Sequence, residues 1–302
     1  MTQRVAVIGL GNMGAPVAGH CRAAGFPTLG HDVDAGRVAA FRDAGGLPEP
    51  LEEALPTLDA VILFVVNDRQ VETVLFGDVD GNGGGMVGRL RKGAAVICSA
   101  TVPPAFAKDM AARCDAAGIG YLDAPVSGGA AGAEKGTLSV LASGAPDTLA
   151  TVRPILDAYA ANIYDLGPEP GVGSAMKAVN QLLCGVHIAA MAEAMAFGRT
   201  QGVAPELFAR VIPTCAGTSW MLEDRAPHVV AGDYRSRSAV DIWPKDLGIV
   251  ASIAEAAGFE APLTEAALAK FRAASAAGLG AEDDAAVTKI YARQAGVTLP
   301  GD

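Results

Sequence analysis

A lysine stands near the start of a long apolar segment, where it could carry out acid and base chemistry. Lys177 lies in "GVGSAMKAVNQLLCGVHIAAMAEAMAFG" (171–198), and the first half of that segment contains no acidic residue. In a helix, Gly173, Lys177 and Gln181 share one face, with Asn180 beside it. Burial beside amides rather than carboxylates would lower the pKa of a lysine toward values useful for proton transfer. The alternative, a lysine that extends from a helix end into water, is favoured by this segment taken alone.

A glycine motif at the start of the chain points to a dinucleotide. "VAVIGLGNMG" places Gly9, Gly11 and Gly14 in GxGxxG spacing between a strand-like and a helix-like run, where backbone N–H groups can bind a pyrophosphate. The alternative is a tight turn without a ligand. Asp32 ends the next strand-like run, where a carboxylate binds the ribose hydroxyls of NAD and repels a 2′-phosphate. Val33, not arginine, follows it, so the sequence predicts NAD rather than NADP.

Two further short motifs could contact a substrate. Ser127, Gly128 and Gly129 follow a strand-like run, and the backbone N–H groups of such a turn can bind a carboxylate. An ordinary loop is an equally good interpretation of these three residues. Lys245 and Asp246 stand together at a predicted helix start, and adjacent residues do not face each other on a helix, so Lys245 is expected to extend toward a ligand.

The elements that must position these residues fall into two halves. In the first half, short apolar runs alternate with helical stretches such as 12–24 and 103–117. This pattern predicts βαβ units and a doubly wound parallel sheet, an α/β fold. The expected strands are 4–9, 27–32, 60–66, 94–99, 120–126 and 137–143.

The second half is predicted to be helical throughout. Residues 171–200 contain no proline and are expected to form one long helix. The later helices are expected at 205–213, 219–231, 244–257, 262–277 and 283–294. The domain boundary is predicted between residues 166 and 167, and the glycine-rich stretch 77–88 is predicted to be a flexible loop.

Composition narrows the class of protein. The chain has 302 residues, 51% of them hydrophobic, with a net charge of −10 and no basic run, which argues against nucleic acid as a partner. We find no leader-like or membrane-spanning apolar run and expect a cytoplasmic protein with no membrane partner. Nothing resembles a metal-binding spacing, so no metal is expected. Five scattered cysteines are expected to be buried free thiols: Cys21, Cys98, Cys114, Cys184 and Cys215.

Together these motifs resemble the β-hydroxyacid dehydrogenases, the family of 3-hydroxyisobutyrate dehydrogenase, over essentially the full chain. The resemblance rests on "GLGNMGAPVA", "DAPVSGGAAGAEKGTLSVLASG", "GVGSAMKAVNQ" and "KDLGIV" in this order. It implies an N-terminal Rossmann domain that binds NAD (1–166), an all-helical domain for substrate and oligomer contacts (167–302), and a long helix that joins them. It also implies that Lys177 donates and accepts the proton.

The resemblance carries roles onto individual positions. The catalytic residues implied are Lys177, Gln181 and Asn180, and the substrate carboxylate falls to Ser127, Gly128 and Gly129. Thr101 matches a residue near the nicotinamide, and Lys245 matches one that lines the cofactor and substrate cleft. The full set expected at the cofactor is Gly9, Leu10, Gly11, Asn12, Met13, Gly14, Asp32, Asn67, Thr101 and Lys245.

One residue departs from the family pattern. The family usually has asparagine four residues after the catalytic lysine, and this chain has Gln181. Together with the sequence around 219–250, Gln181 makes the chain similar to the branch of the family that oxidises L-threonate. This resemblance implies oxidation at C2 to a 2-keto acid. The alternatives are oxidation of 3-hydroxyisobutyrate, reduction of tartronate semialdehyde, and a non-catalytic NAD-binding module. The alanine-rich long helix suggests a homodimer or homotetramer.

Overall fold

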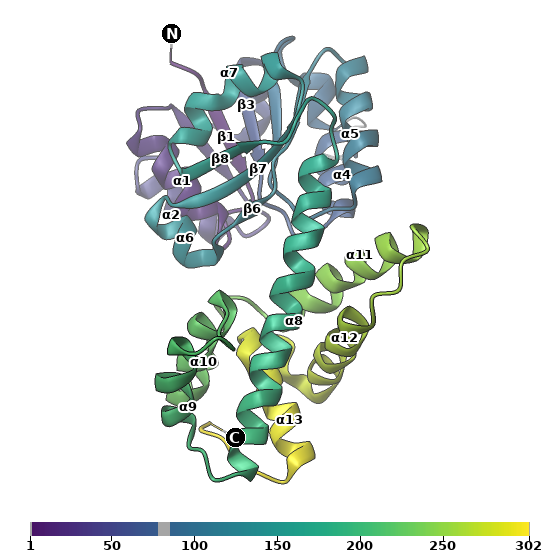
Figure 1. Ribbon diagram of the computed structural model, residues 1–302. Coiled ribbons are helices and arrows are strands. Elements are labelled where there is room, and N and C mark those ends of the chain that lie inside the picture. The colour runs from purple at the N-terminus through teal and green to yellow at the C-terminus, as the bar shows by residue number, and fades with distance from the viewer. Residues whose placement is uncertain (1, 78–84, 302) are drawn as a thin grey trace. The chain divides into compact units, whose positions relative to one another are not determined.

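The computed structural model describes residues 2–77 and 85–301 (Figure 1). The chain forms two compact units, Met1–Lys177 and Ala178–Asp302. The division falls inside the long helix α8 (Val172–Thr200), a few residues after the boundary predicted between 166 and 167. Both units therefore share one continuous helix.

The first unit is built around an eight-stranded sheet with the order β2-β1-β3-β4-β5-β7-β6, in which β8 also pairs with β7. The strands are β1 (Val5–Ile8), β2 (Thr28–His31), β3 (Ala60–Leu63), β4 (Ala95–Cys98), β5 (Gly120–Asp123), β6 (Val126–Ser127), β7 (Leu138–Gly144) and β8 (Ala160–Asp165). The helices are α1 (Gly14–Ala23), α2 (Ala35–Asp43), α3 (Leu51–Ala54), α4 (Asp68–Phe76), α5 (Pro104–Ala116), α6 (Gly129–Lys135) and α7 (Pro146–Asp157). The predicted α/β fold is confirmed.

Two details of the sheet differ from the prediction. The run 120–126 divides into β5 and β6, and β7 pairs antiparallel with both, so the continuous parallel part of the sheet ends at β5, and β8 is parallel to β7. Strand β8 was not predicted, because its residues are mostly exposed and form no apolar run. Apolar periodicity identifies strands that are buried on both faces and misses strands at an edge.

The parallel strands end in register. His31, Ile8, Leu63, Cys98 and Asp123 are connected as successive neighbours across β2, β1, β3, β4 and β5. The residues that follow these strands must therefore emerge along one edge of the sheet. The strand order reverses beside β1, which is where ligands bind in open α/β sheets.

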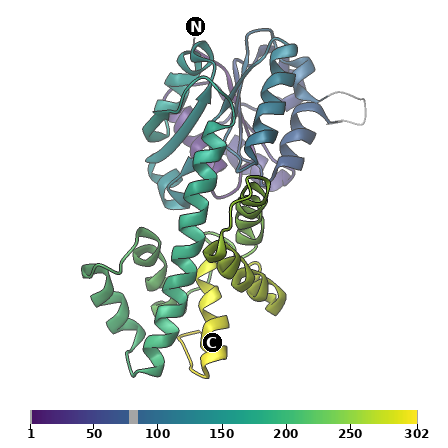
Figure 2. The same ribbon diagram turned by 45° about the vertical axis from the view of Figure 1, so that its right-hand side comes forward.

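Alternate residues of each strand enter two separate cores. Ala6 and Ile8 pack with residues of α3, α4 and α5, whereas Val5 and Val7 pack with residues of α1, α2, α6 and α7. Figure 2 shows this unit turned so that the helices on both faces of the sheet can be followed. Because both faces are covered, the central strands carry apolar residues at every position.

The second unit wraps helices around the C-terminal part of α8. The helices are α9 (Pro205–Val211), α10 (Trp220–Ala231), α11 (Ile242–Ala256), α12 (Pro262–Ala274) and α13 (Val287–Ala295). Ile188 and Ala192 of α8 pack with α11, α12 and α13, while Met191 and Met195 pack with α9, α10 and α13. All six predicted helices of this half are present, although 275–279 forms a π turn and 284–286 a 3-10 turn.

Three further expectations can be compared with the structure. The core of the predicted loop 77–88, residues 78–84, lies outside the described residues, and Met86–Arg89 forms a 3-10 turn rather than a loop. Cys21, Cys98 and Cys114 are buried free thiols as expected, whereas Cys184 is half-buried and Cys215 is exposed. Helix α8 is long and apolar enough to span a membrane by length and composition alone, a test that the core helix of a soluble protein also passes.

Candidate active site

The glycine turn after β1 has the backbone geometry that its motif requires. Gly9 has a φ of +93°, and a Cβ there would lie 2.5 Å from the Phe64 carbonyl oxygen. A Cβ on Gly14 would lie 1.8 Å from the Gly9 carbonyl oxygen, whereas one on Gly11 would meet nothing closer than Arg37 Nη1 at 3.9 Å. Gly11 is thus the position where a pyrophosphate can approach the backbone. The same turn carries Leu10, Asn12 and Met13.

Asp32 is held against this turn by backbone hydrogen bonds. Its Oδ2 accepts from Leu10 N (2.7 Å) and its Oδ1 from Asp34 N (2.9 Å). Partial burial raises the pKa of Asp32, but these hydrogen bonds and the nearby Arg37 charge outweigh burial, and the pKa lies below its ordinary value. Arg37 Nη1 lies 3.4 Å from Asp32 Oδ2. An ionised carboxylate at this place fits two ribose hydroxyls and disfavours a 2′-phosphate.

Asn67 and Thr101 lie at the same sheet edge as the glycine turn, because they follow β3 and β4. Asn67 begins α4, and its Oδ1 accepts a hydrogen bond from Gln70 N at 2.9 Å. Thr101 is half-buried in the short segment between β4 and α5. Their predicted roles beside the cofactor fit this position in the fold.

The Ser127–Gly129 turn joins β6 to α6. Gly128 and Gly129 have φ values of +123° and +60°, which favour glycine over other residues. A Cβ on Gly129 would meet no atom within 4 Å, so the turn is open on that side. At the other end of α6, the His20 ring of α1 lies 3.1 Å from the Ala133 oxygen, which ties α6 to the helix that follows the glycine turn.

One buried carboxylate anchors the start of α8. Asp123 Oδ2 accepts hydrogen bonds from Gly171 N (3.0 Å) and Ser174 N (2.8 Å), and Oδ1 accepts from Ser174 Oγ (2.7 Å). Ser143 Oγ donates to the same carboxylate and accepts from Gly173 N (2.9 Å). Burial raises the pKa of Asp123, and the bonds from Ser174, Gly171 and Ser143 oppose that shift. The carboxylate thus satisfies the N–H groups at this helix start.

Lys177 follows this anchor by less than one helical turn and is buried. Gly173 lets another segment of the chain approach the helix backbone closely. A Cβ on Gly173 would lie 2.4 Å from the Leu141 oxygen and 2.8 Å from the Asp123 oxygen, so the sheet backbone occupies that space. Glycine is needed here because α8 begins in contact with β5 and β7.

In the second unit, the two amides after Lys177 belong to a buried hydrogen-bond chain. Asn180 Nδ2 donates to Gln181 Oε1 (3.0 Å), and Gln181 Nε2 donates to Asp246 Oδ2 (2.5 Å). Lys245 Nζ forms an ion pair with Asp246 Oδ1. The inference that Lys245 and Asp246 do not face each other is therefore wrong, because the flexible lysine side chain folds back on its neighbour. Asp246, which sequence reasoning did not place in the site, is the residue that Gln181 and Lys245 share.

A close helix crossing makes this chain possible. A Cβ on Gly185 of α8 would lie 2.8 Å from Leu247 Cδ2 of α11. Without a side chain at Gly185, α11 approaches α8 closely enough for Asp246 to reach Gln181. Gly185 follows Gln181 by four residues, so the two lie on the same face of α8, which is the signal that the sequence offered.

The predicted residues therefore form two local groups joined through α8. The first unit holds the glycine turn, Asp32, Asn67, Thr101, Ser127–Gly129 and Lys177, and the second holds Asn180, Gln181 and Lys245. Within the described residues, 2–77 and 85–301, no three His, Cys, Asp or Glu side chains are grouped to bind a metal ion.

Two family models match the chain. The model described as the NAD binding domain of 6-phosphogluconate dehydrogenase matches residues 4–167. The model described as NAD-binding of NADP-dependent 3-hydroxyisobutyrate dehydrogenase matches residues 171–291. The two models together span both units.

Named relatives match over almost the whole chain. An L-threonate dehydrogenase of Cupriavidus necator is 45% identical over 302 residues, 100% of this chain and 99% of the relative. An L-threonate dehydrogenase of Escherichia coli strain K12 is 44% identical over 299 residues, 98% of this chain and 96% of the relative. A crystal structure described as 3-hydroxyisobutyrate dehydrogenase from Salmonella typhimurium is 43% identical with a TM-score of 0.89, covering 95% of this chain and 99% of that one.

The glycine turn predicts opposite outcomes for two substitutions. Gly11→Ala should leave the melting temperature unchanged and raise the Kd for NAD by about tenfold or more, equivalent to about 1.4 kcal/mol, because the methyl group enters only the space of the pyrophosphate. Gly14→Ala should instead destabilise the fold, because its Cβ would overlap the Gly9 oxygen. Calorimetry with NAD and thermal unfolding measure both effects, and unchanged NAD binding by Gly11→Ala would contradict the cofactor position.

The Asp123 anchor predicts a large loss of stability from a small chemical change. Asp123→Asn should lower the free energy of unfolding by about 3 kcal/mol, because the amide NH₂ faces N–H and O–H donors and leaves them unpaired. Asp34→Asn is the matched control, since Asp34 caps exposed α2 through Gly36 N, its ion pair with Arg37 is exposed, and asparagine is an equally good cap. Denaturant unfolding compares them, and equal losses would show that Asp123 is an ordinary cap.

Proposed function

The chain belongs to the β-hydroxyacid dehydrogenase family, to which 3-hydroxyisobutyrate dehydrogenase also belongs, and it is an NAD-dependent dehydrogenase; we propose that its substrate is L-threonate. The product is then the 2-keto acid formed by oxidation at C2. Sequence identity of 44–45% over nearly the full length of two L-threonate dehydrogenases carries this proposal. The Gln181–Asp246–Lys245 chain supports it, since a polyol acid needs polar partners that an apolar wall does not provide.

The rival substrate is 3-hydroxyisobutyrate, which is in the name of the Salmonella typhimurium relative. Its methyl group requires an apolar wall, whereas Gln181 supplies an amide. Reduction of a small semialdehyde such as tartronate semialdehyde is a second rival within the same chemistry. A non-catalytic NAD-binding module is disfavoured, because it would have no use for Lys177 together with the Ser127–Gly129 turn.

The chain's own groups divide the work of the proposed reaction. The Gly9–Gly14 turn and Asp32 fit NAD, because Gly11 is open and Asp32 is an ionised acceptor. Bound NAD supplies the acceptor for the hydride that leaves C2. Lys177, in its neutral form, takes the proton of the C2 hydroxyl. Ser127 Oγ and the N–H groups of Gly128 and Gly129 bind the substrate carboxylate.

The remaining polar residues orient these groups. Gln181 and Asn180 are proposed to hold the substrate hydroxyl or the Lys177 amine, and their mutual hydrogen bond fixes the two amides relative to each other. Asn67 and Thr101 are proposed to contact the cofactor from the ends of their strands, and Lys245 to contact cofactor and substrate. We retain 1–166 as the NAD-binding domain and 167–302 as the domain for substrate and oligomer contacts.

We propose a homodimer or homotetramer in the cytoplasm, without nucleic acid or membrane as a partner. An apolar hollow of about 450 Å³ between α8 and α9 includes Phe197, Leu207 and Val211. Phe197 is 65% exposed, which a second copy of the chain would cover. The net charge of −10 and the buried free thiols agree with a protein of the cytoplasm that does not bind nucleic acid.

Loss of the Lys177 amine should abolish proton transfer while the cofactor still binds. Lys177→Ala should lower kcat by about 10²-fold or more and leave the Kd for NAD within about twofold. In the parent protein the rate should rise from neutral toward alkaline pH, since ordinary lysine is protonated below about pH 10. Lys108→Ala, a change of an exposed lysine in α5, is the control. Near-normal turnover by Lys177→Ala would assign the base elsewhere.

A panel of small hydroxy acids tests the substrate. Initial rates with NAD and NADP should be measured on L-threonate, D-threonate, D-erythronate, L-glycerate, L-serine and 3-hydroxyisobutyrate. We expect NAD-dependent oxidation of L-threonate with kcat/KM at least about tenfold above that for 3-hydroxyisobutyrate, because unpaired buried polar groups disfavour a methyl group. The reverse order would leave the mechanism in place and refute the substrate.

A further inference from the structure

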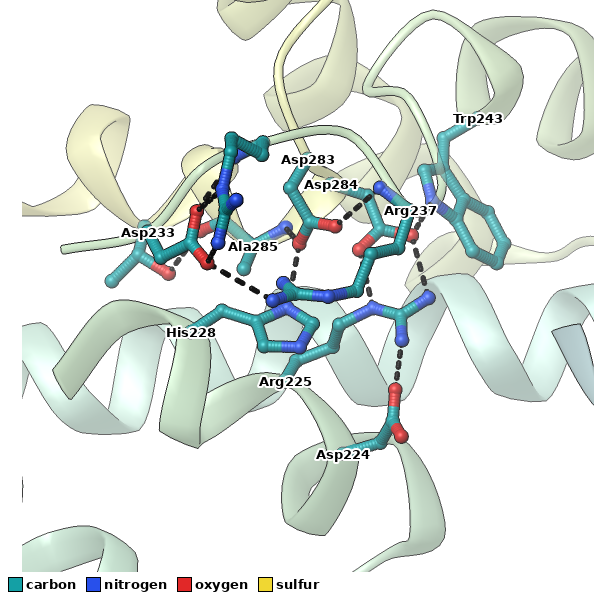
Figure 3. A network of polar contacts seen from close by, with 11 residues as sticks. Asp224, Arg225, His228, Asp233, Arg237, Trp243, Asp283, Asp284 and Ala285 are labelled. Atoms are coloured by element: carbon teal, nitrogen blue, oxygen red, sulfur yellow. Dashed lines mark hydrogen bonds and ion pairs between the residues drawn. The ribbon is translucent and has the colours of Figure 1, made fainter. Parts of the chain in front are cut away.

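Two adjacent carboxylates, Asp283 and Asp284, lie at the centre of the second unit, and the proposed chemistry uses neither of them (Figure 3). Both side chains are fully buried. Asp284 accepts hydrogen bonds from Arg225 Nε (2.5 Å) and Nη2 (3.2 Å) and from the indole Nε1 of Trp243 (2.9 Å). Burial raises the pKa of Asp284, and Arg225 and Trp243 oppose that shift. A charged group in this position is costly, so its partners have to be specific.

Both carboxylates bind α10, Asp284 through Arg225 and Asp283 through His228, and each also binds one further segment. Asp283 accepts from His228 Nδ1 (2.9 Å) of α10 and from Arg237 N (3.1 Å) in the segment before α11. Asp284 instead reaches the first turn of α11 through Trp243. In Figure 3 the indole of Trp243 and the guanidinium of Arg225 meet Asp284, while His228 meets Asp283. Single donors to the pair, such as His228 and Trp243, can therefore be removed one at a time.

Trp243 lies within one turn of the residues that form the buried amide chain. Lys245 and Asp246 follow it by two and three positions, and Asp246 Oδ2 receives the Gln181 amide at 2.5 Å. The indole is further held by stacking on Phe271 of α12, with ring centroids 5.4 Å apart. A small rotation of this turn would move the Asp246 carboxylate away from Gln181, which is buried.

We propose that Asp284 is a positioning residue for the reaction, which acts through the Trp243 indole to hold Lys245 and Asp246 where Gln181 can be oriented. This inference rests on the proposed roles of Gln181 and Lys245. It gives the buried Arg225–Asp284 pair a function beyond cohesion of the helices.

The test compares two substitutions that each keep an aromatic ring and remove one N–H donor to the carboxylate pair. Trp243→Phe removes the donor to Asp284 and should raise the KM for L-threonate and lower kcat, with kcat/KM reduced by about tenfold or more. His228→Phe removes the donor to Asp283 and should leave kcat/KM within about twofold at a similar loss of melting temperature. Equal kinetic losses at equal loss of stability would show that the network only holds the fold together.

A spectroscopic measurement tests whether the effect passes through the indole. The chain has two tryptophans, and Trp220 is 60% exposed, so Trp220→Phe leaves Trp243 as the single reporter. In that background Asp284→Asn should increase acrylamide quenching of Trp243 together with the rise in KM. A rise in KM with unchanged acrylamide quenching of Trp243 would show that Asp284 does not act through the indole and would overturn the proposal. If the panel of hydroxy acids identifies a substrate other than L-threonate, the same variants are compared on that acid. Failure of the substrate proposal is thereby distinguished from failure of the positioning role of Asp284.

Discussion

The Asp123 carboxylate accepts hydrogen bonds from backbone N–H groups at the buried start of α8. A helix start leaves its first N–H groups without partners inside the helix. Here Gly171 N and Ser174 N donate directly to Asp123, and Gly173 N is satisfied through Ser143. Because successive residues of a helix turn by a constant angle, this anchor sets the direction in which the side chains of α8 up to Lys177 point.

The hydrogen bonds to Asp123 also determine the position of Lys177. It follows Ser174 by three residues in an unbroken helix, so the bonds of Ser174 to Asp123 locate the lysine relative to β5. Asp123 is also the last residue of β5, in register with the last residues of the other parallel strands. One strand end thus connects the edge that carries the glycine turn with the helix that carries the lysine.

Buried carboxylates hold the starts of both α8 and α11. Asp246 lies in the first turns of α11 and joins Gln181 to Lys245, and Asp284 holds the same part of α11 through Trp243. Each such acid costs free energy on burial and repays it only with well-placed donors. The gain is orientation, since an amide such as Gln181 has two ends that a substrate would distinguish.

Many strands, helices and motifs could be predicted from the sequence, because each of them depends on residues that are close together in the chain. Apolar runs identified the strands that are buried on both faces, and GxGxxG at a strand end identified the turn that we propose binds NAD. The resemblance of the motifs identified the family. Strand β8 was not predicted, because a strand at the edge of a sheet does not need an apolar run.

Only the tertiary structure decided which polar groups meet. Asp123, Ser143 and Ser174 are far apart in sequence, and no spacing rule connects them. The segment that approaches Gly173 could not be identified from the sequence for the same reason, since the β5 and β7 backbone that it contacts is distant in the chain. Gln181 and Asp246 are also far apart in sequence, and their contact depends on α11 approaching α8 at Gly185. Contacts of this kind arise from packing, which no local pattern encodes.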